Sequence, residues 1–104
     1  MILVLGSVVA REGRIQEALA MSQEHVARSR QEPGCIAHAV HLDYDNPQRL
    51  VFVEKWVSEA SLWEHFKVPA SREFAKAMGE LAAEPSSLEI FQTTQIAPPG
   101  RSAD

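Results

Sequence analysis

The chain is poor in the residues that build disulfides and thiolate metal sites. Cys35 is the single cysteine among 104 residues, which excludes an intramolecular disulfide and a site with several thiolate ligands. The sequence also lacks a glycine-rich phosphate loop, a dinucleotide-binding fingerprint and a recognisable metal-ligand motif. We therefore predict no cofactor and no metal. The lone cysteine favours a reducing compartment, and we expect a cytoplasmic protein.

Long apolar runs and clustered positive charge are also missing. No segment approaches the ~20 apolar residues needed to cross a bilayer. The apolar start is broken by Gly6 and Ser7 and has no basic region before it, so it is typical of a strand rather than a signal peptide. The net charge is −4 and the ten basic residues are scattered, whereas nucleic-acid binding depends on clustered Lys and Arg. We expect neither a membrane nor a nucleic-acid partner.

The patterns along the chain fit one domain, residues 1–97, followed by a polar tail, residues 98–104, that we expect to be disordered. Alternating or apolar runs predict four strands, at Ile2–Val9, Cys35–Leu42, Arg49–Val57 and Leu88–Ile96. Helical spacing predicts a first helix that Pro33 and Gly34 end, a short helix from Glu59 to about Phe66 with Ser58 as its N-cap, and a third helix that begins at Pro69. The segment from Asp43 to Pro47 is dense in turn formers and should reverse the chain.

This order, β-α-β-β-α-α-β, predicts an α+β, ferredoxin-like fold in which helices cover one face of a four-stranded antiparallel sheet. Both faces of the first three strands are mostly apolar; in the first, Leu3 and Leu5 alternate with Ile2 and Val4. An antiparallel sheet with one face in water should alternate apolar with polar residues, and no segment is left to cover the second face. We therefore predict a homodimer that packs sheet against sheet.

The most specific candidate site joins Trp56, at the end of the third strand, to His65 on the helix that follows. An indole wall and an imidazole suit a flat, hydrophobic aromatic molecule, with His65 as the group that takes or gives a proton, since histidine titrates near neutral pH. The alternative is that Trp56 is core and His65 a helix-surface residue. Four further residues are predicted either to line the same pocket or to pack as ordinary core: Phe52, Phe66, Phe74 and Met78.

The remaining histidines and one carboxylate are further candidates for functional residues. His38 and His41 have the spacing of a metal pair, but on a strand they point to opposite faces and cannot share an ion. His25, beside Glu24, is expected on the solvated side of the first helix. Glu54 shares a strand face with Phe52 and Trp56, and a carboxylate on an apolar face needs a partner. For Glu54 we predict an ion pair between subunits.

The order of several short motifs resembles a known family. The sequence reads P-G-C, then a hairpin through N-P, then F-V-E-K-W, then S-x-x-x-L-x-x-H-F. This pattern resembles the antibiotic biosynthesis monooxygenase family over Ile2 to Gln95, nearly the whole chain. The resemblance implies a small dimeric α/β barrel with a pocket between the sheet and the helices of each subunit. Trp56 matches the family's tryptophan at the end of the third strand, and His65 matches the histidine on the next helix.

Family members include cofactor-free monooxygenases of phenols and quinols, haem-degrading enzymes and small-molecule isomerases. Haem-degrading relatives carry an asparagine on the first strand, where this chain has Gly6 or Ser7, and quinol-oxidising relatives often have a second histidine where this chain has Ala70 and Ser71. The function that the resemblance implies is a cofactor-independent monooxygenase that oxidises a phenolic, quinol or polycyclic aromatic molecule with O₂. The alternatives are a non-catalytic protein that binds a small ligand or haem, and an isomerase.

Overall fold

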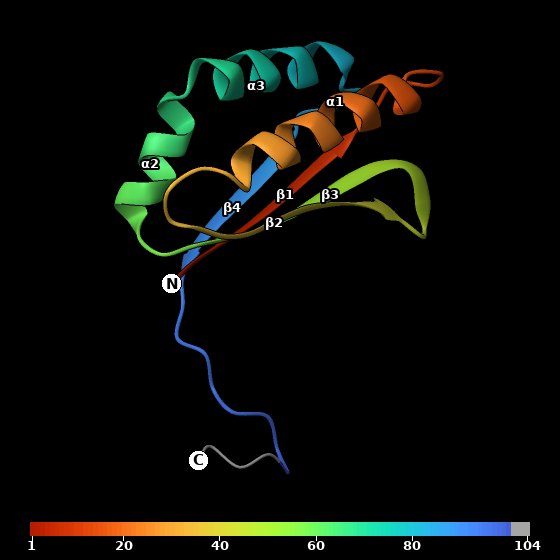
Figure 1. Cartoon of the computed structure of the whole chain (residues 1–104). Helices are drawn as coiled ribbons and strands as arrows, with labels where there is room; N and C mark the ends of the chain where they lie inside the picture. The colour runs from red at the N-terminus through yellow and green to blue at the C-terminus, as the bar shows by residue number, and fades with distance from the viewer. Residues whose placement is uncertain (101–104) are drawn as a thin grey trace.

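The computed structural model describes residues 1–100 and has the predicted order of elements (Figure 1). The four strands are β1 (Ile2–Val9), β2 (Cys35–Asp43), β3 (Asn46–Trp56) and β4 (Ser87–Gln92), and the three helices are α1 (Ile15–Ser29), α2 (Glu59–Lys67) and α3 (Pro69–Leu81). The predicted tail lies partly outside the described residues. Its described part belongs to a segment, residues 93–100, that contains no helix or strand.

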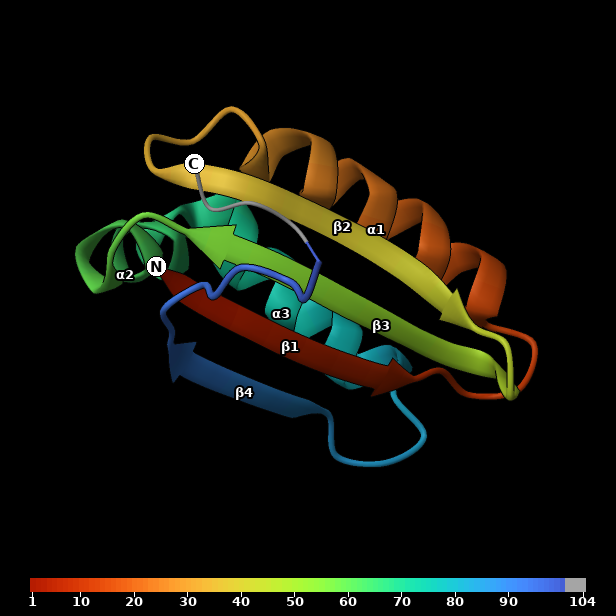
Figure 2. The same ribbon diagram turned by 90° about the horizontal axis from the view of Figure 1, so that it is seen from below.

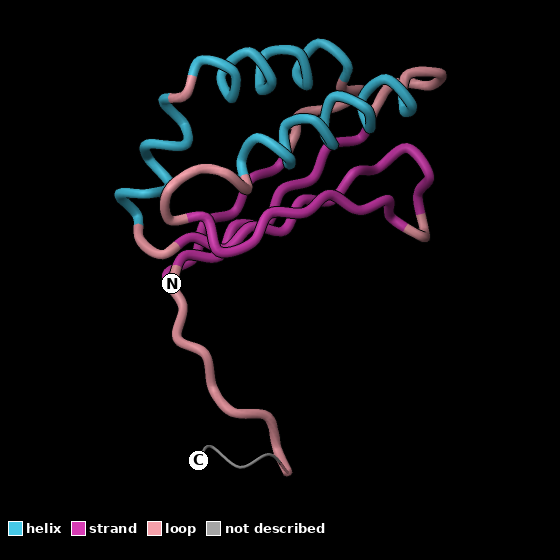
Figure 3. Tube along the Cα trace, in the orientation of Figure 1, coloured by secondary structure: helices cyan, strands magenta, loops and turns pink. Residues whose placement is uncertain are grey.

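The strands form one antiparallel sheet in the order β2-β3-β1-β4, so the first strand is central and the last lies at an edge. All three helices lie on the same side of this sheet, which gives a two-layer molecule (Figures 1 and 3). The predicted α+β, ferredoxin-like architecture is therefore confirmed. Its helix layer and its sheet enclose the candidate site described below.

The opposite face of the sheet carries no helix or strand within residues 1–100 (Figure 2). Strand β1 alternates strictly: Ile2, Val4 and Val8 are buried under the helices, whereas Leu3 and Leu5 on the other face are only half-buried. On that outer face Leu3 lies between Lys55 and Phe91, Leu5 lies between Val53 and Glu89, and Val51 lies beside Ser7. The outer face of the single chain therefore carries the apolar residues that the sequence predicted, together with the charged Lys55 and Glu89.

One detail of β2 differs from the simple alternation in its sequence. Cys35 pairs with Trp56 and Ala37 with Lys55, so Ile36 is an extra residue, a β-bulge. Because of this bulge, Cys35 rather than Ile36 lies on the helix-facing side, and Ile36 is exposed. From Ala37 onward the alternation resumes as predicted, with His38 on the inner face.

The bounds of several elements differ from those that the sequence indicated. The predicted five-residue turn is a two-residue hairpin turn at Tyr44 and Asp45, since Asp43 already pairs with Asn46. Likewise α1 ends at Ser29, before Pro33 and Gly34, and the following turn is held by backbone bonds such as that from the Glu32 amide to the Ser29 carbonyl. Strand β4 ends at Gln92 rather than Ile96, whose side chain is exposed.

The other helix signals agree with the structure. The Ser58 side chain accepts a hydrogen bond from the Ser61 amide at 3.2 Å, as expected of an N-cap of α2. Pro69 is the first residue of α3, where its fixed φ and missing N–H are compatible with a helix. These two starts fix the positions of α2 and α3 above the sheet.

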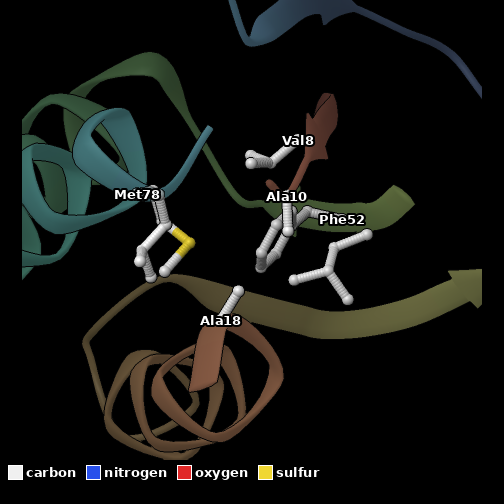
Figure 4. Packing of buried hydrophobic residues seen from close by; sticks show 7 residues of the cluster. Val8, Ala10, Ala18, Phe52 and Met78 are labelled. Carbon is white, nitrogen blue, oxygen red and sulfur yellow. The ribbon is translucent and has the colours of Figure 1, made fainter. Parts of the chain in front are cut away.

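Two clusters of buried apolar side chains join the layers. The larger one lies between β1, β3, α1 and α3 and contains Val8, Ala10, Ala18, Phe52 and Met78 (Figure 4). The smaller one lies under α2 and consists of Ile2, Val4, Trp56 and Leu62. The histidine-rich region described next also lies between the two layers.

The turn before β2 supplies the first testable prediction. Gly34 has φ +83°, and a Cβ there would collide with the Ser61 side chain; Gly13 has a similar φ, +81°, with open space around it. We expect Gly13→Ala to cost ~1–2 kcal/mol from backbone strain alone. Gly34→Ala should cost that amount plus ~1–3 kcal/mol of overpacking. Urea unfolding of both variants measures the difference, and equal losses would show that the Ser61 contact is unimportant.

Candidate functional site

A cavity of about 420 Å³ lies between the inner face of the sheet and helices α2 and α3. Most of the side chains predicted as site residues line it: His65 and Phe66 from α2, Phe52 from β3, and Phe74 and Met78 from α3. The other lining residues are Gly6, Ser7 and Val8 of β1, His25 of α1, Glu54 of β3, Ser71, Arg72 and Ala75 of α3, and Ser86, Ser87 and Leu88 at β4. The space is therefore largely apolar, with a few polar groups in its wall.

Trp56 does not line this cavity. It is completely buried in the smaller core cluster, and its indole N–H donates a 2.9 Å hydrogen bond to Oε1 of Glu54. The same carboxylate oxygen lies 3.3 Å from Nε2 of His38. The prediction that Glu54 forms an ion pair between subunits is therefore wrong, because Glu54 lies on the helix-facing side of the sheet and finds its partners within its own chain.

His65 is held by a carboxylate from another part of the chain. Its imidazole is 4% exposed, and its Nδ1 lies 2.8 Å from Oε1 of Glu32, in the turn between α1 and β2. A carboxylate can only accept a hydrogen bond, so the neutral tautomer that fits this contact has its proton on Nδ1 and its lone pair on Nε2. Both Glu32 and His65 also border a second hollow of about 440 Å³ on the outer side of this pair. The imidazole is thus part of the wall between the inner cavity and that hollow.

Three histidines from three elements meet beside this wall. His25 of α1, His38 of β2 and His65 of α2 have ring centroids 5.3–5.7 Å apart. The expectation that His25 is solvated is wrong, since its side chain is 5% exposed and its ring stacks on Phe74 at 4.0 Å. The buried face of α1 is therefore wider than its aliphatic residues alone indicated.

Burial shapes the protonation of this region. Desolvation, followed by the nearby His38 and His65, lowers the pKa of His25 from 6.5 to about 3, so its imidazole is neutral at physiological pH. Desolvation alone would raise the pKa of Glu54, but the nearby His38 imidazole and the hydrogen bond from the Trp56 N–H outweigh it and lower that pKa. Desolvation, reinforced by Glu54 and Glu32, raises the pKa of the Cys35 thiol. Glu54 is thus a stabilised buried carboxylate.

The sequence did not identify Glu32, His25 or Arg72 as site residues. Glu32 lies 33 positions before His65, and only the fold brings the two together. His25 does fall on the helical spacing of Ala18, Ser22 and Ser29, which are all buried. Serines are compatible with the buried face of a helix, because a serine hydroxyl can bond to the backbone carbonyl four residues earlier, as both do here. The helical spacing of these residues could therefore have indicated that His25 is buried.

The fold and the cavity define a small ferredoxin-like protein with a mostly apolar cavity between its sheet and its helices. Residues 1–77 match the family described as antibiotic biosynthesis monooxygenase. The chain belongs to this family. The protein sll1783 of Synechocystis is 31% identical over 94 residues, which are 90% of this chain and 64% of that protein. The chain therefore spans about 64% of the length of this curated relative.

Solved structures agree with this assignment. Protein SO0527 from Shewanella oneidensis is 31% identical, covers 86% of this chain and 87% of its own, and has a TM-score of 0.81. A crystal structure of an antibiotic biosynthesis monooxygenase is 22% identical, with a TM-score of 0.84 over 91% of this chain and all of that one. At that identity the second likeness supports the fold alone. Separately, none of the helices within residues 1–100 has both the length and the apolar character needed to cross a membrane.

Proposed function

We propose that the protein is a cofactor-independent monooxygenase of a phenolic, quinol or polycyclic aromatic molecule, with His65 as the base. The observation that carries this proposal is the Glu32–His65 pair at the wall of an apolar cavity. A carboxylate behind an imidazole fixes its tautomer and orientation and leaves Nε2 to accept a proton. Phe52, Phe74 and Met78 supply the apolar surface on which an aromatic ring would lie.

In the proposed reaction His65 takes the phenolic proton, and the resulting electron-rich phenolate reduces O₂ by one electron. The radical pair combines into a carbon-bound peroxide anion, which takes the proton back from the His65 imidazolium, and the resulting hydroperoxide loses water to give a quinone. Both oxygen atoms of O₂ are then accounted for, one in the quinone and one in water. The protein contributes orientation, exclusion of water and stabilisation of the phenolate charge. Arg72, which also lines the cavity, is the positive charge suited to the last role.

Glu32 also stabilises the imidazolium that forms during the proposed reaction. Its carboxylate contacts Nδ1 of His65 at 2.8 Å and is 17% exposed, whereas the imidazole is 4% exposed. The negative charge of Glu32 favours the protonated imidazole while His65 holds the phenolic proton at Nε2. The imidazole regains its basic form when Nε2 gives that proton to the peroxide.

The proposed active unit is a homodimer that packs through the outer face of the sheet. This face carries Leu3, Leu5, Val51, Val53 and Phe91 without a covering element in residues 1–100. Apolar side chains gathered beside charged ones, here Lys55 and Glu89, are typical of interaction surfaces. A second copy supplies a surface of the same shape and character, as an isologous interface requires.

Oxygen uptake with a panel of hydroquinones tests the proposed catalytic role. We expect His65→Ala to lower the rate by ~10²–10⁴-fold, the contribution typical of a positioned base. Glu32→Gln should lower it less, because the imidazole remains but loses the carboxylate that orients it. The measurement is the initial rate of O₂ consumption at saturating substrate, together with the quinone absorbance.

Lys67→Ala is the control on the same helix as His65, since Lys67 is exposed on α2 and does not line the cavity. It should keep the wild-type rate. If no hydroquinone supports O₂ uptake, while ligands bind saturably and equally well to wild type and to His65→Ala, then the protein is a binding module and the catalytic proposal is wrong.

A further inference from the structure

The three buried histidines have a feature that the proposed oxygenase chemistry does not use. One ring nitrogen from each of His25, His38 and His65 can be chosen so that all three lie within 4.8 Å of one another. They come from α1, β2 and α2, so the cluster joins both layers of the fold. His25 and His65 also line the cavity, which places the cluster at its wall.

Several of these nitrogens have no hydrogen-bond partner within residues 1–100. They are Nδ1 of His25 and both nitrogens of His38, all of them buried. Nε2 of His38 lies 3.3 Å from Glu54, but not in line for a hydrogen bond. Buried polar atoms in native proteins nearly always find a partner, so three such atoms in one place need an explanation. A group that accepts lone pairs would satisfy one nitrogen of His25 and one nitrogen of His38 together.

In two of the three histidines, a carboxylate lies next to one of the ring nitrogens. Glu32 contacts Nδ1 of His65 at 2.8 Å, and Glu54 lies 3.3 Å from Nε2 of His38. This leaves Nε2 of His65 and Nδ1 of His38 as the nitrogens available for a ligand. Histidines that bind metal ions commonly give their other N–H to a carboxylate, which fixes the ring and makes it a better ligand. Glu54 is itself fixed by the indole of Trp56.

We propose that His25, His38 and His65 form a binding site for one first-row divalent transition-metal ion, with Zn²⁺ as the reference ion. Three imidazoles are a donor set that suits Zn²⁺, Cu²⁺, Ni²⁺ and Fe²⁺ and disfavours Mg²⁺ and Ca²⁺. Tetrahedral Zn–N bonds place the nitrogens ~3.4 Å apart. The three nitrogens, now up to 4.8 Å apart, must therefore approach one another on binding. Three protein ligands leave a fourth position open, as in metal sites that bind a water or a substrate.

This site was not expected from the sequence, which indicated no metal. His38 and His41, the pair with a suggestive spacing, do point to opposite faces, and His41 is exposed. The partners of His38 come instead from positions 25 and 65. The inference does not rest on the proposed function. The two roles compete for Nε2 of His65, so saturating Zn²⁺ should inhibit a reaction in which that nitrogen is the base.

Imidazole NMR of the untagged, EDTA-treated wild-type chain tests the site directly. The chain has only four histidines, and His41→Gln identifies the exposed one. On titration with Zn²⁺ we expect the ring nitrogens of three histidines to shift together and saturate at one ion per chain, while His41 stays unchanged. Co²⁺ should give the visible absorption of a nitrogen-ligated ion with low coordination number and be displaced by Zn²⁺.

Affinity measurements on variants add a second readout. Glu32→Gln should weaken Zn²⁺ binding by ~10–100-fold, as loss of an outer-shell partner does, whereas Glu64→Gln, an exposed carboxylate on α2, should change nothing. The NMR experiment needs no variant in the cluster, so a failure of His25→Ala or His38→Ala to fold does not weaken the test. The inference is overturned if the folded wild type shows no saturable shift of His25, His38 and His65, or if Zn²⁺ shifts His41 alone.

Discussion

Replacing Trp56 with alanine is expected to lower the free energy of unfolding by ~3–5 kcal/mol, the range for large aromatic side chains in cores. The side chain is completely buried against Ile2, Val4 and Leu62. Its removal leaves a cavity and also deprives the buried Glu54 carboxylate of a 2.9 Å hydrogen bond. For a domain of this size, such a loss is a large part of the total stability. Urea unfolding followed by far-UV circular dichroism measures it.

The second tryptophan is a matched control. Trp63 lies on α2 and is 44% exposed, so Trp63→Ala should cost ~1 kcal/mol or less. Trp56→Phe separates the two contributions, because it keeps most of the packing and removes the N–H; it should cost ~1–3 kcal/mol for the unsatisfied acceptor. If the two alanine variants unfold at the same urea concentration, then Trp56 is not the centre of this cluster.

Replacing Val53 with glutamate is expected to convert the proposed homodimer into a monomer. Val53 lies on the outer face of the central strand β3, opposite Leu5 of β1 and Ala39 of β2. In a two-fold dimer the substitution occurs twice, and each unpaired buried charge costs ~3–5 kcal/mol. The dissociation constant should therefore rise by at least ~10³-fold. Sedimentation velocity across a range of micromolar concentrations measures the change.

Val57→Glu makes the same chemical change outside the strands, at a valine that is 60% exposed. It should leave the dimer unchanged. Far-UV circular dichroism should show that the Val53→Glu chain is still folded, because Val53 is only half-buried in the single chain. A wild-type protein that sediments as a monomer at micromolar concentration would contradict the sheet-to-sheet interface altogether.

The fold could be predicted because its signals are local. Each strand start and helix start depends on neighbouring residues, such as the N-cap at Ser58 and the proline at the start of α3. The errors fall where a partner far along the chain decides the outcome. Strand β4 ends where its pairing with β1 ends, at Gln92 opposite Ile2, although its sequence remains compatible with a strand to Ile96.

The candidate site was predictable only in part for the same reason. His65 and the apolar residues Phe52, Phe74 and Met78 line one cavity because strand and helix periodicities already fixed their faces. The role of Glu32 could not be predicted from its neighbours. A carboxylate in a turn that contacts a histidine on another element has the same local sequence features as a carboxylate in solvent. His25 was misplaced because polarity alone suggests solvent, whereas a buried histidine can be stabilised by an aromatic ring such as Phe74.

The extra residue in β2 shows how a deletion at this point of the chain would affect the inward-pointing side chains. Ile36 is looped out between two residues that pair with consecutive positions of β3. Deleting it would restore regular pairing from Cys35 to Leu42, with Cys35 still beside Trp56 and His38 still opposite Glu54. A homologue shorter by one residue here would therefore keep the same inward-pointing side chains. A gap placed at Ile36 is then the correct one when such sequences are aligned, and a gap placed after His38 would assign the wrong residue to the histidine cluster.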